Sequence, residues 1–115
     1  MVADYSMCCQ TVTVYRQNGP EILRQVIPGC FLQWEVETGQ DENGSWQERN
    51  FLLIQPGQEQ LVFPGDTVFE GIGPELNIED WEPFLSSALS SLGEVNYASV
   101  YHWEGKFCHT EAGRN

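Results

Sequence analysis

The sequence predicts a mainly β fold, a small β-barrel or sandwich of about seven to eight short strands with one amphipathic helix at about residues 80–92. Three short apolar runs lie within residues 51–71, FLLIQPGQEQLVFPGDTVFEG. Gln55-Pro56-Gly57 and Pro64-Gly65-Asp66 separate these runs. Proline fixes φ and glycine tolerates positive φ, so both segments favour turns. Short strands between such turns are typical of a small barrel or sandwich.

The first half of the chain alternates in the manner of paired strands. Residues 10–17 place Val12 and Val14 on one face, and their β-branched content favours a strand. Asn18-Gly19 is a strong hairpin signal, although we expect Pro20 and Glu21 to lengthen the loop before a returning strand at 22–27. Pro28-Gly29 predicts a further turn. Strands are then expected at 30–37 and 46–55, and, near the C-terminus, at 94–103 and 107–110.

One segment changes to a helical period. Asp80 is a suitable N-cap, Pro83 falls in the first turn, and Gly93 can end the helix in the left-handed conformation. We expect the apolar face to cover the sheet. Its members recur at helical spacing: Trp81, Phe84, Leu85, Ala88, Leu89 and Leu92.

A chain of 115 residues is expected to form one domain. We assign residues 10–111 to a single β-rich domain, 1–9 to a flexible N-terminal arm and 112–115 to a C-terminal tail. The N-terminal MVADYSMCCQ lacks the basic and apolar regions of a signal peptide, which predicts a reducing compartment. The four cysteines are therefore expected to be free thiols.

The charge argues against two classes of partner. Seventeen acidic residues face five basic ones, and the formal net charge is −12. Binding to nucleic acid or anionic lipid requires clustered lysine and arginine, and the basic residues here are scattered. Sequence-specific binding to DNA or RNA and membrane attachment are therefore not expected.

The sequence lacks the residue patterns typical of metal, catalytic or phosphate-binding sites. Zinc ligands usually come in local pairs two to four residues apart, and adjacent strand residues such as Cys108 and His109 point to opposite faces. A cysteine nucleophile would need a distant base such as His102. Asp66 is expected to bond its own turn, and GIGPE lacks the lysine of a phosphate loop. We therefore predict no enzyme, no cofactor and no metal. The residues considered for these roles are Cys8, Cys9, Asp66, Glu70, His102, Cys108, His109 and Glu111.

Exposed turns and aromatic residues point instead to protein contacts. Residues 38–45, TGQDENGS, form the most polar stretch and predict a hairpin tip that reaches a neighbouring molecule. Trp46, Tyr101 and Trp103 stand at strand ends, and tryptophan and tyrosine are enriched at interfaces. We predict these three as interface residues. The projecting loop is predicted at Gln40, Asp41, Glu42, Asn43 and Gly44.

Four segments carry a resemblance to a family: the opening TVTVYR hairpin, the long polar tip, VFPGDTVFEGIGPE and the closing KFCHTEAGR. Their order resembles the small head-to-tail connector proteins of tailed phages and prophages, in particular the head-closure, or stopper, β-barrels. That likeness implies a homo-oligomeric ring in the virion, stacked between portal-bound adaptor and tail proteins, through which DNA passes without specific binding. It implies no catalytic residues. Four cysteines and a capped helix are not hallmarks of stoppers, so a tail-terminator or another minor capsid or tail protein stays an alternative.

Two functions of another class are also considered. A small metal- or ligand-binding β-barrel would need several convergent histidines, and the chain has two. An acidic inhibitory domain would dock a basic partner with salt-sensitive affinity. Both rank below the connector.

Overall fold

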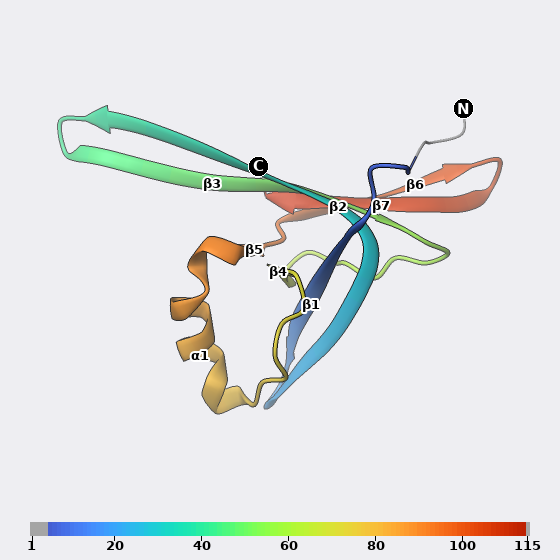
Figure 1. Ribbon diagram of the computed structural model, residues 1–115, viewed down its shortest axis with the longest axis horizontal. Helices are drawn as coiled ribbons and strands as arrows, with labels where there is room; N and C mark the ends of the chain where they lie inside the picture. Colours follow the sequence, from blue (N-terminus) through green and yellow to red (C-terminus); the bar gives the residue numbers. More distant parts are fainter. Residues whose placement is uncertain (1–4, 115) are drawn as a thin grey trace.

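The computed structural model describes residues 5–114, with the side chains of all except 37 and 46–48. It is mainly β with a single helix, as predicted (Figure 1). The strands are β1 (Gln10–Asn18), β2 (Glu21–Asp41), β3 (Gly44–Pro56), β4 (Thr67–Glu70), β5 (Leu92–Glu94), β6 (Tyr97–Trp103) and β7 (Lys106–Arg114).

The strands form one curled antiparallel sheet in the order β5-β4-β1-β2-β3-β7-β6. The 21-residue β2 holds it together, because its first part pairs with β1 and its second part with β3. The turn predicted at Pro28-Gly29 is wrong: the chain bends there and continues. Gln10 pairs with Cys30 and Val12 with Ile27, so two residues of β2 oppose one of β1. Such a bulge bends a strand, and Gly29 permits its φ of +70°.

The hairpin turns are tight. Asn18 pairs with Glu21, so the first loop is only Gly19-Pro20, shorter than predicted. Glycine at the first loop position, here with φ of +61°, is what a type II′ turn requires. Glu104 and Gly105 form the β6–β7 turn with φ of +52° and +77°, as in a type I′ turn. Both turn types follow the twist of the flanking strands.

The strand predicted at 94–103 is interrupted where the chain crosses between the two ends of the sheet. The Val95 N–H donates to the Asp66 carbonyl, and the Asn96 N–H to the Gly113 carbonyl, both at 2.8 Å. Val95 is almost fully buried in a core shared by both halves of the sheet. The main members of that core are Val12, Val14, Ile27, Leu32, Phe51, Leu53, Val62, Val68 and Ala112.

The C-terminal residues 112–114, predicted as a tail, belong to β7. Ala112 is fully buried, and a Cβ on Gly113 would collide with the Phe51 carbonyl oxygen. Ala112 and Gly113 are small because strands β3 and β6 close on them from both sides. Residue 115 lies outside the described part.

The helix α1 spans Ile78–Ser87, followed by a 3₁₀ turn at Leu89–Ser91. It begins two residues before the predicted start, with Asn77 as N-cap. Asp80 stands three residues further on, where its carboxylate accepts the Asn77 N–H at 3.2 Å. Gly93 lies in β5 and does not cap the helix. The rings of Trp81 and Phe84 pack on Tyr15, at centroid distances of 5.7 and 5.4 Å.

Side-chain hydrogen bonds hold the segment between β4 and α1 against the sheet. The Tyr15 hydroxyl donates to the Pro74 carbonyl at 2.7 Å, and Arg24 Nε donates to the Gly73 carbonyl at 2.9 Å. The Thr13 hydroxyl donates to the Gly71 carbonyl and accepts the Gly73 N–H, both at 2.8 Å. This glycine- and proline-rich connector is therefore held by the side chains of β1 and β2.

Candidate functional site

The most prominent surface feature is a two-stranded ribbon, which we define as residues 35–50 of β2 and β3. The last residue pair between β3 and β7 is Phe51 with Arg114, so the described ribbon has no third strand beyond that point. Figure 1 shows it extending well past the rest of the sheet. Val36 is half exposed on it. A two-stranded ribbon without further support is only marginally stable in water, so this one is suited to lie against another surface.

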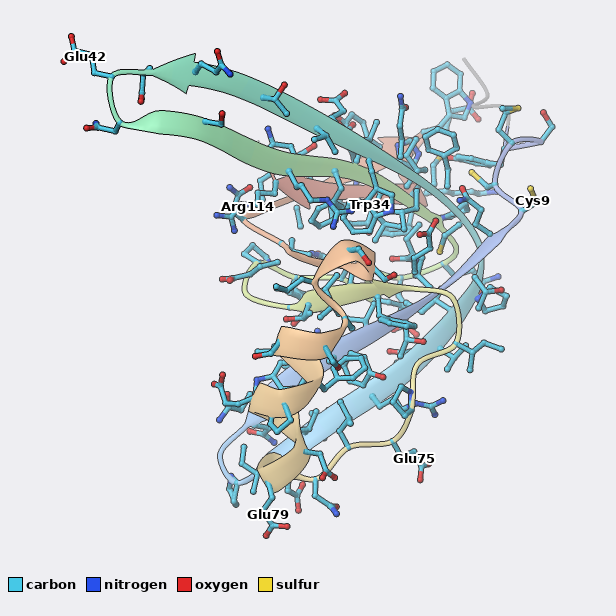
Figure 2. All side chains as sticks on the ribbon, turned by 60° about the vertical axis from the view of Figure 1, so that its left-hand side comes forward. Cys9, Trp34, Glu42, Glu75, Glu79 and Arg114 are labelled. Atoms are coloured by element: carbon cyan, nitrogen blue, oxygen red, sulfur yellow. The ribbon has the colours of Figure 1, made fainter. Side chains whose placement is uncertain are left out.

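The predicted loop residues stand at the end of the ribbon. Asp41 pairs with Gly44, which leaves Glu42-Asn43 as the turn. The Asp41 carboxylate accepts the Asn43 N–H at 2.8 Å, and Gln40 Nε2 lies 3.5 Å from the Ser45 hydroxyl. Figure 2 shows Glu42 pointing away from the protein at the far end. The tip is thus acidic and exposed.

The three predicted interface aromatics do not come together. Trp46 lies in the ribbon, where its backbone pairs with Gly39, and its side chain is outside the described part. Tyr101 and Trp103 lie on the β6–β7 hairpin, which extends in the opposite direction (Figure 1). Their side chains are 46 % and 44 % exposed, which is high for aromatic residues in a domain of this size.

An aromatic stack at the base of this hairpin has no signal in the sequence. His109 pairs with Tyr101 across the strands, and their rings stack at 4.8 Å. Tyr5 also meets the imidazole edge to face at 5.5 Å, with its hydroxyl 2.6 Å from Nδ1. Burial lowers the pKa of His109, and the nearby Glu111 carboxylate opposes this. Tyr5 thereby fastens the described part of the N-terminal arm to β7, whereas the arm was predicted as flexible; residues 1–4 lie outside the described part.

A groove opens where the ribbon leaves the sheet. Arg49 forms its wall: two guanidinium nitrogens donate to the Leu89 and Ser90 carbonyls at 2.7 Å, and the cation lies 4.6 Å from the Trp34 ring centroid. Arg49 thereby ties the base of the ribbon to the 3₁₀ turn that follows α1. The groove encloses about 590 Å³. Its lining includes Arg49, Leu89, Leu92, Gly93, Glu94 and Arg114.

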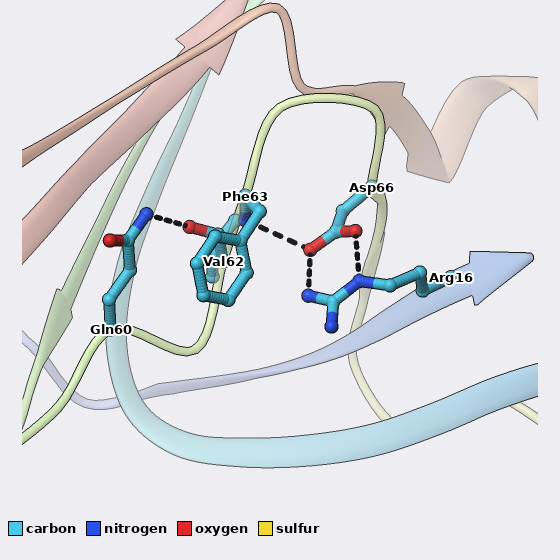
Figure 3. Close-up of polar contacts among 5 residues, drawn as sticks. All are labelled: Arg16, Gln60, Val62, Phe63 and Asp66. Carbon is cyan, nitrogen blue, oxygen red and sulfur yellow. Dashed lines mark hydrogen bonds and ion pairs between the residues drawn. The ribbon is translucent and has the colours of Figure 1, made fainter. Parts of the chain in front are cut away.

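Asp66, Glu70 and His102, which were considered for chemical roles, make structural contacts within the chain. Both oxygens of Asp66 accept from Arg16, and one also accepts the Phe63 N–H at 2.9 Å, so Asp66 bonds its own turn as expected (Figure 3). Glu70 accepts the Trp34 indole N–H at 3.3 Å. His102 meets Phe107 edge to face, apart from the His109 stack. Among the side chains that the structure describes, the histidines, cysteines and acids form no group of three or more that could hold a metal ion.

Comparisons with known proteins found no match for this chain among family models, curated proteins or solved structures. Among the described residues, the single helix is too short to cross a bilayer. The surface features described above therefore carry the functional argument.

Proposed function

We propose that this protein is a non-enzymatic structural component that assembles with copies of itself into a ring. The observation that carries the proposal is the ribbon, which extends without a third strand in the described part of the chain. Within that part, its strand edges present unpaired backbone N–H and C=O groups beyond Phe51, and such edges invite contact with another chain. A ribbon of this length is stabilised when a neighbouring subunit lies against it.

The resemblance of four sequence segments supplies the setting. We propose the head-closure, or stopper-like, position of a tailed-phage connector, with adaptor or portal and tail proteins as neighbours in the virion. The net charge of −12 suits a wall that DNA passes without binding, because acidic groups repel phosphate. A tail-terminator or another minor capsid or tail role is the alternative within the same class. Copurification with portal and adaptor proteins supports the first position, and copurification with tail-tube proteins the second.

Native mass measured over a concentration series tests the assembly. We expect a concentration-dependent rise to one defined multiple of the 13.1 kDa chain, unchanged by a chelator. A monomer at every soluble concentration that also binds no portal, adaptor or tail protein would contradict the proposal.

A shortened ribbon tests the observation itself. Glu37 pairs with Glu48, so replacing residues 38–47 by Asn-Gly leaves a two-residue hairpin at that register. We expect this variant to melt within a few degrees of the parent chain, because the removed residues lie beyond the core, and to assemble less tightly. Asp41→Asn/Glu42→Gln is the control, since it removes the tip charges and keeps the ribbon. Undiminished assembly of the shortened variant would exclude the ribbon as a subunit contact.

A further inference from the structure

One end of β7 lies at the protruding β6–β7 turn, and the other end lies in the groove. Lys106 begins the strand beside the β6–β7 turn, and Arg114 ends it in the groove. Eight residue steps separate them, or ~26 Å at ~3.3 Å per step. The hairpin turn and the ribbon extend in opposite directions from the sheet (Figure 1). One subunit therefore cannot bring its own hairpin into its own groove.

The hairpin end is an aromatic knob, which we define as Tyr101, Trp103, Glu104 and Lys106. Trp103 pairs directly with Lys106 across the strands. All four side chains are exposed. The knob therefore combines exposed aromatic surface with one acid and one base at its tip.

The groove carries apolar surface and charged side chains that complement those of the knob. Leu89 is 68 % exposed on its rim, and Val36, the cross-strand neighbour of Arg49, extends the apolar surface onto the ribbon. Its volume of about 590 Å³ falls in the range of about 300–1,000 Å³ typical of binding pockets. Besides Arg49, whose guanidinium bonds the Leu89 and Ser90 carbonyls, the groove carries one acid, Glu94, and one further base, Arg114. Figure 2 shows Arg114 pointing outward near the base of the ribbon.

The distribution of cations indicates which partner fits. Arg16, Arg24 and Arg49 donate hydrogen bonds to Asp66, Gly73, Leu89 and Ser90 within the chain. The other two basic side chains are Lys106 on the knob and Arg114 in the groove, and neither makes an ion pair with a side chain that the structure describes. Each surface thus pairs an unused cation with an exposed carboxylate.

We propose that the knob of one subunit inserts into the groove of the next, a contact that rests on the self-assembly proposed above. Trp103 and Tyr101 pack on Leu89, Leu92 and Val36, Lys106 meets Glu94, and Glu104 meets Arg114. The two faces of this contact differ, so it is head-to-tail, and such contacts make rings when the rotation between subunits closes. The ribbon of each subunit then extends over its neighbour.

A charge exchange with native mass readout tests this contact. Lys106→Glu and Glu94→Lys each place like charges face to face, and each is expected to weaken assembly about tenfold or more. The double variant Lys106→Glu/Glu94→Lys restores the pairing and is expected to return most of the affinity. Trp103→Ala removes the largest apolar contact and is expected to weaken assembly about tenfold or more.

Two matched control variants separate loss of this contact from a general effect of changing surface charge or apolar area. Glu75→Lys repeats the Glu94 charge change on the exposed connector far from the groove (Figure 2), and Ile72→Ala removes an apolar side chain that is 72 % exposed there. Both are expected to assemble like the parent chain. Parent and single variants that form the same ring with equal affinity would overturn the knob-in-groove contact and leave the proposed function standing. Assembly that stops at two subunits would overturn the head-to-tail geometry. A parent chain that never self-associates, either alone or mixed with portal, adaptor or tail proteins, would overturn both proposals.

Discussion

The guanidinium of Arg16 and the carboxylate of Asp66 meet at two points, Nε to Oδ1 and Nη2 to Oδ2, each at 2.7 Å. Asp66 is almost fully buried, whereas Arg16 is 42 % exposed. The pair joins β1 to the Pro64-Gly65-Asp66 turn, and the Arg16 cation also lies 4.8 Å from the Phe63 ring centroid. Two segments 50 residues apart are held in register by this contact (Figure 3).

Replacing Arg16 leaves a buried carboxylate without its partner. We expect Arg16→Leu to lower the free energy of unfolding by about 2–3 kcal/mol, less than for a fully buried pair because solvent screens Arg16. Arg16→Lys keeps the charge but loses the two-point geometry, so its free energy of unfolding should lie between those of the parent chain and Arg16→Leu. Chemical denaturation measures both. Glu75→Leu, at an exposed position outside the knob and the groove, is the control and is expected to change stability by no more than about 0.5 kcal/mol.

Gly73 has no room for a side chain. A Cβ there would collide with the Tyr15 hydroxyl and lie 3.1 Å from Phe69 Cδ1. We expect Gly73→Ala to destabilise the fold by about 2 kcal/mol, because the packed core resists extra volume. Tyr15→Phe alone should cost about 1 kcal/mol, since its hydroxyl donates to Pro74. The double variant should cost less than the sum, because the clashing oxygen is gone. Strict additivity in thermal or denaturant unfolding would contradict the assigned clash.

Acid should weaken the fold partly through His109. Burial lowers its pKa in the folded protein below the ordinary value of 6.5, so between these two values the unfolded chain binds more protons. Stability from this group is therefore present above pH 6.5 and is lost as the pH falls through the lowered pKa. His109→Phe keeps a ring against Tyr101 and cannot titrate. We expect its unfolding free energy to decline less than that of the parent chain over this window. Parallel pH profiles for the two proteins would exclude this role.

The cysteines should differ in reactivity by position. Cys30 is fully buried, and burial raises the pKa of its thiol to about 12. Against the ordinary value of 9.0, this leaves roughly a thousandfold less thiolate, the form that reacts. Cys9 is exposed. Brief alkylation of the native protein followed by peptide mass mapping should label Cys9 and spare Cys30, and denaturant should remove the difference. Equal labelling in the native state would contradict the burial of Cys30.

Local sequence patterns predicted the structure correctly where it depends on residues close together in the chain. The alternating, β-branched run around Val12 and Val14 predicted β1, and the spacing of Trp81 and Phe84 predicted α1, because residues two apart in a strand and three apart in a helix share a face. The polar run around Glu42 predicted the hairpin tip. Asp66 was expected to bond its own turn, and it does so through the Phe63 N–H.

Local patterns failed where a distant segment decided the outcome. Pro28-Gly29 has the composition of a turn, yet it forms a bulge because β1 and β3 both pair with the same long strand. Residues 112–114 look like a polar tail, yet the Phe51 backbone closes on Gly113 and makes small residues necessary there. The groove has no signal in the sequence, because Arg49, Leu89 and Arg114 come from three separate segments.

The sequence by itself determined the mainly β class, the single helix, the acidic surface and the polar hairpin tip, because composition and short-range periodicity specify these features. Only the tertiary structure decided that the ribbon extends without a third strand, that Tyr101 and Trp103 lie at the opposite end from it, and that a groove opens at its base. Those features depend on which strands pair and where each pairing ends. Strand pairing is a contact between residues far apart in the chain, and the free energy that selects it comes from the shared core of the folded protein.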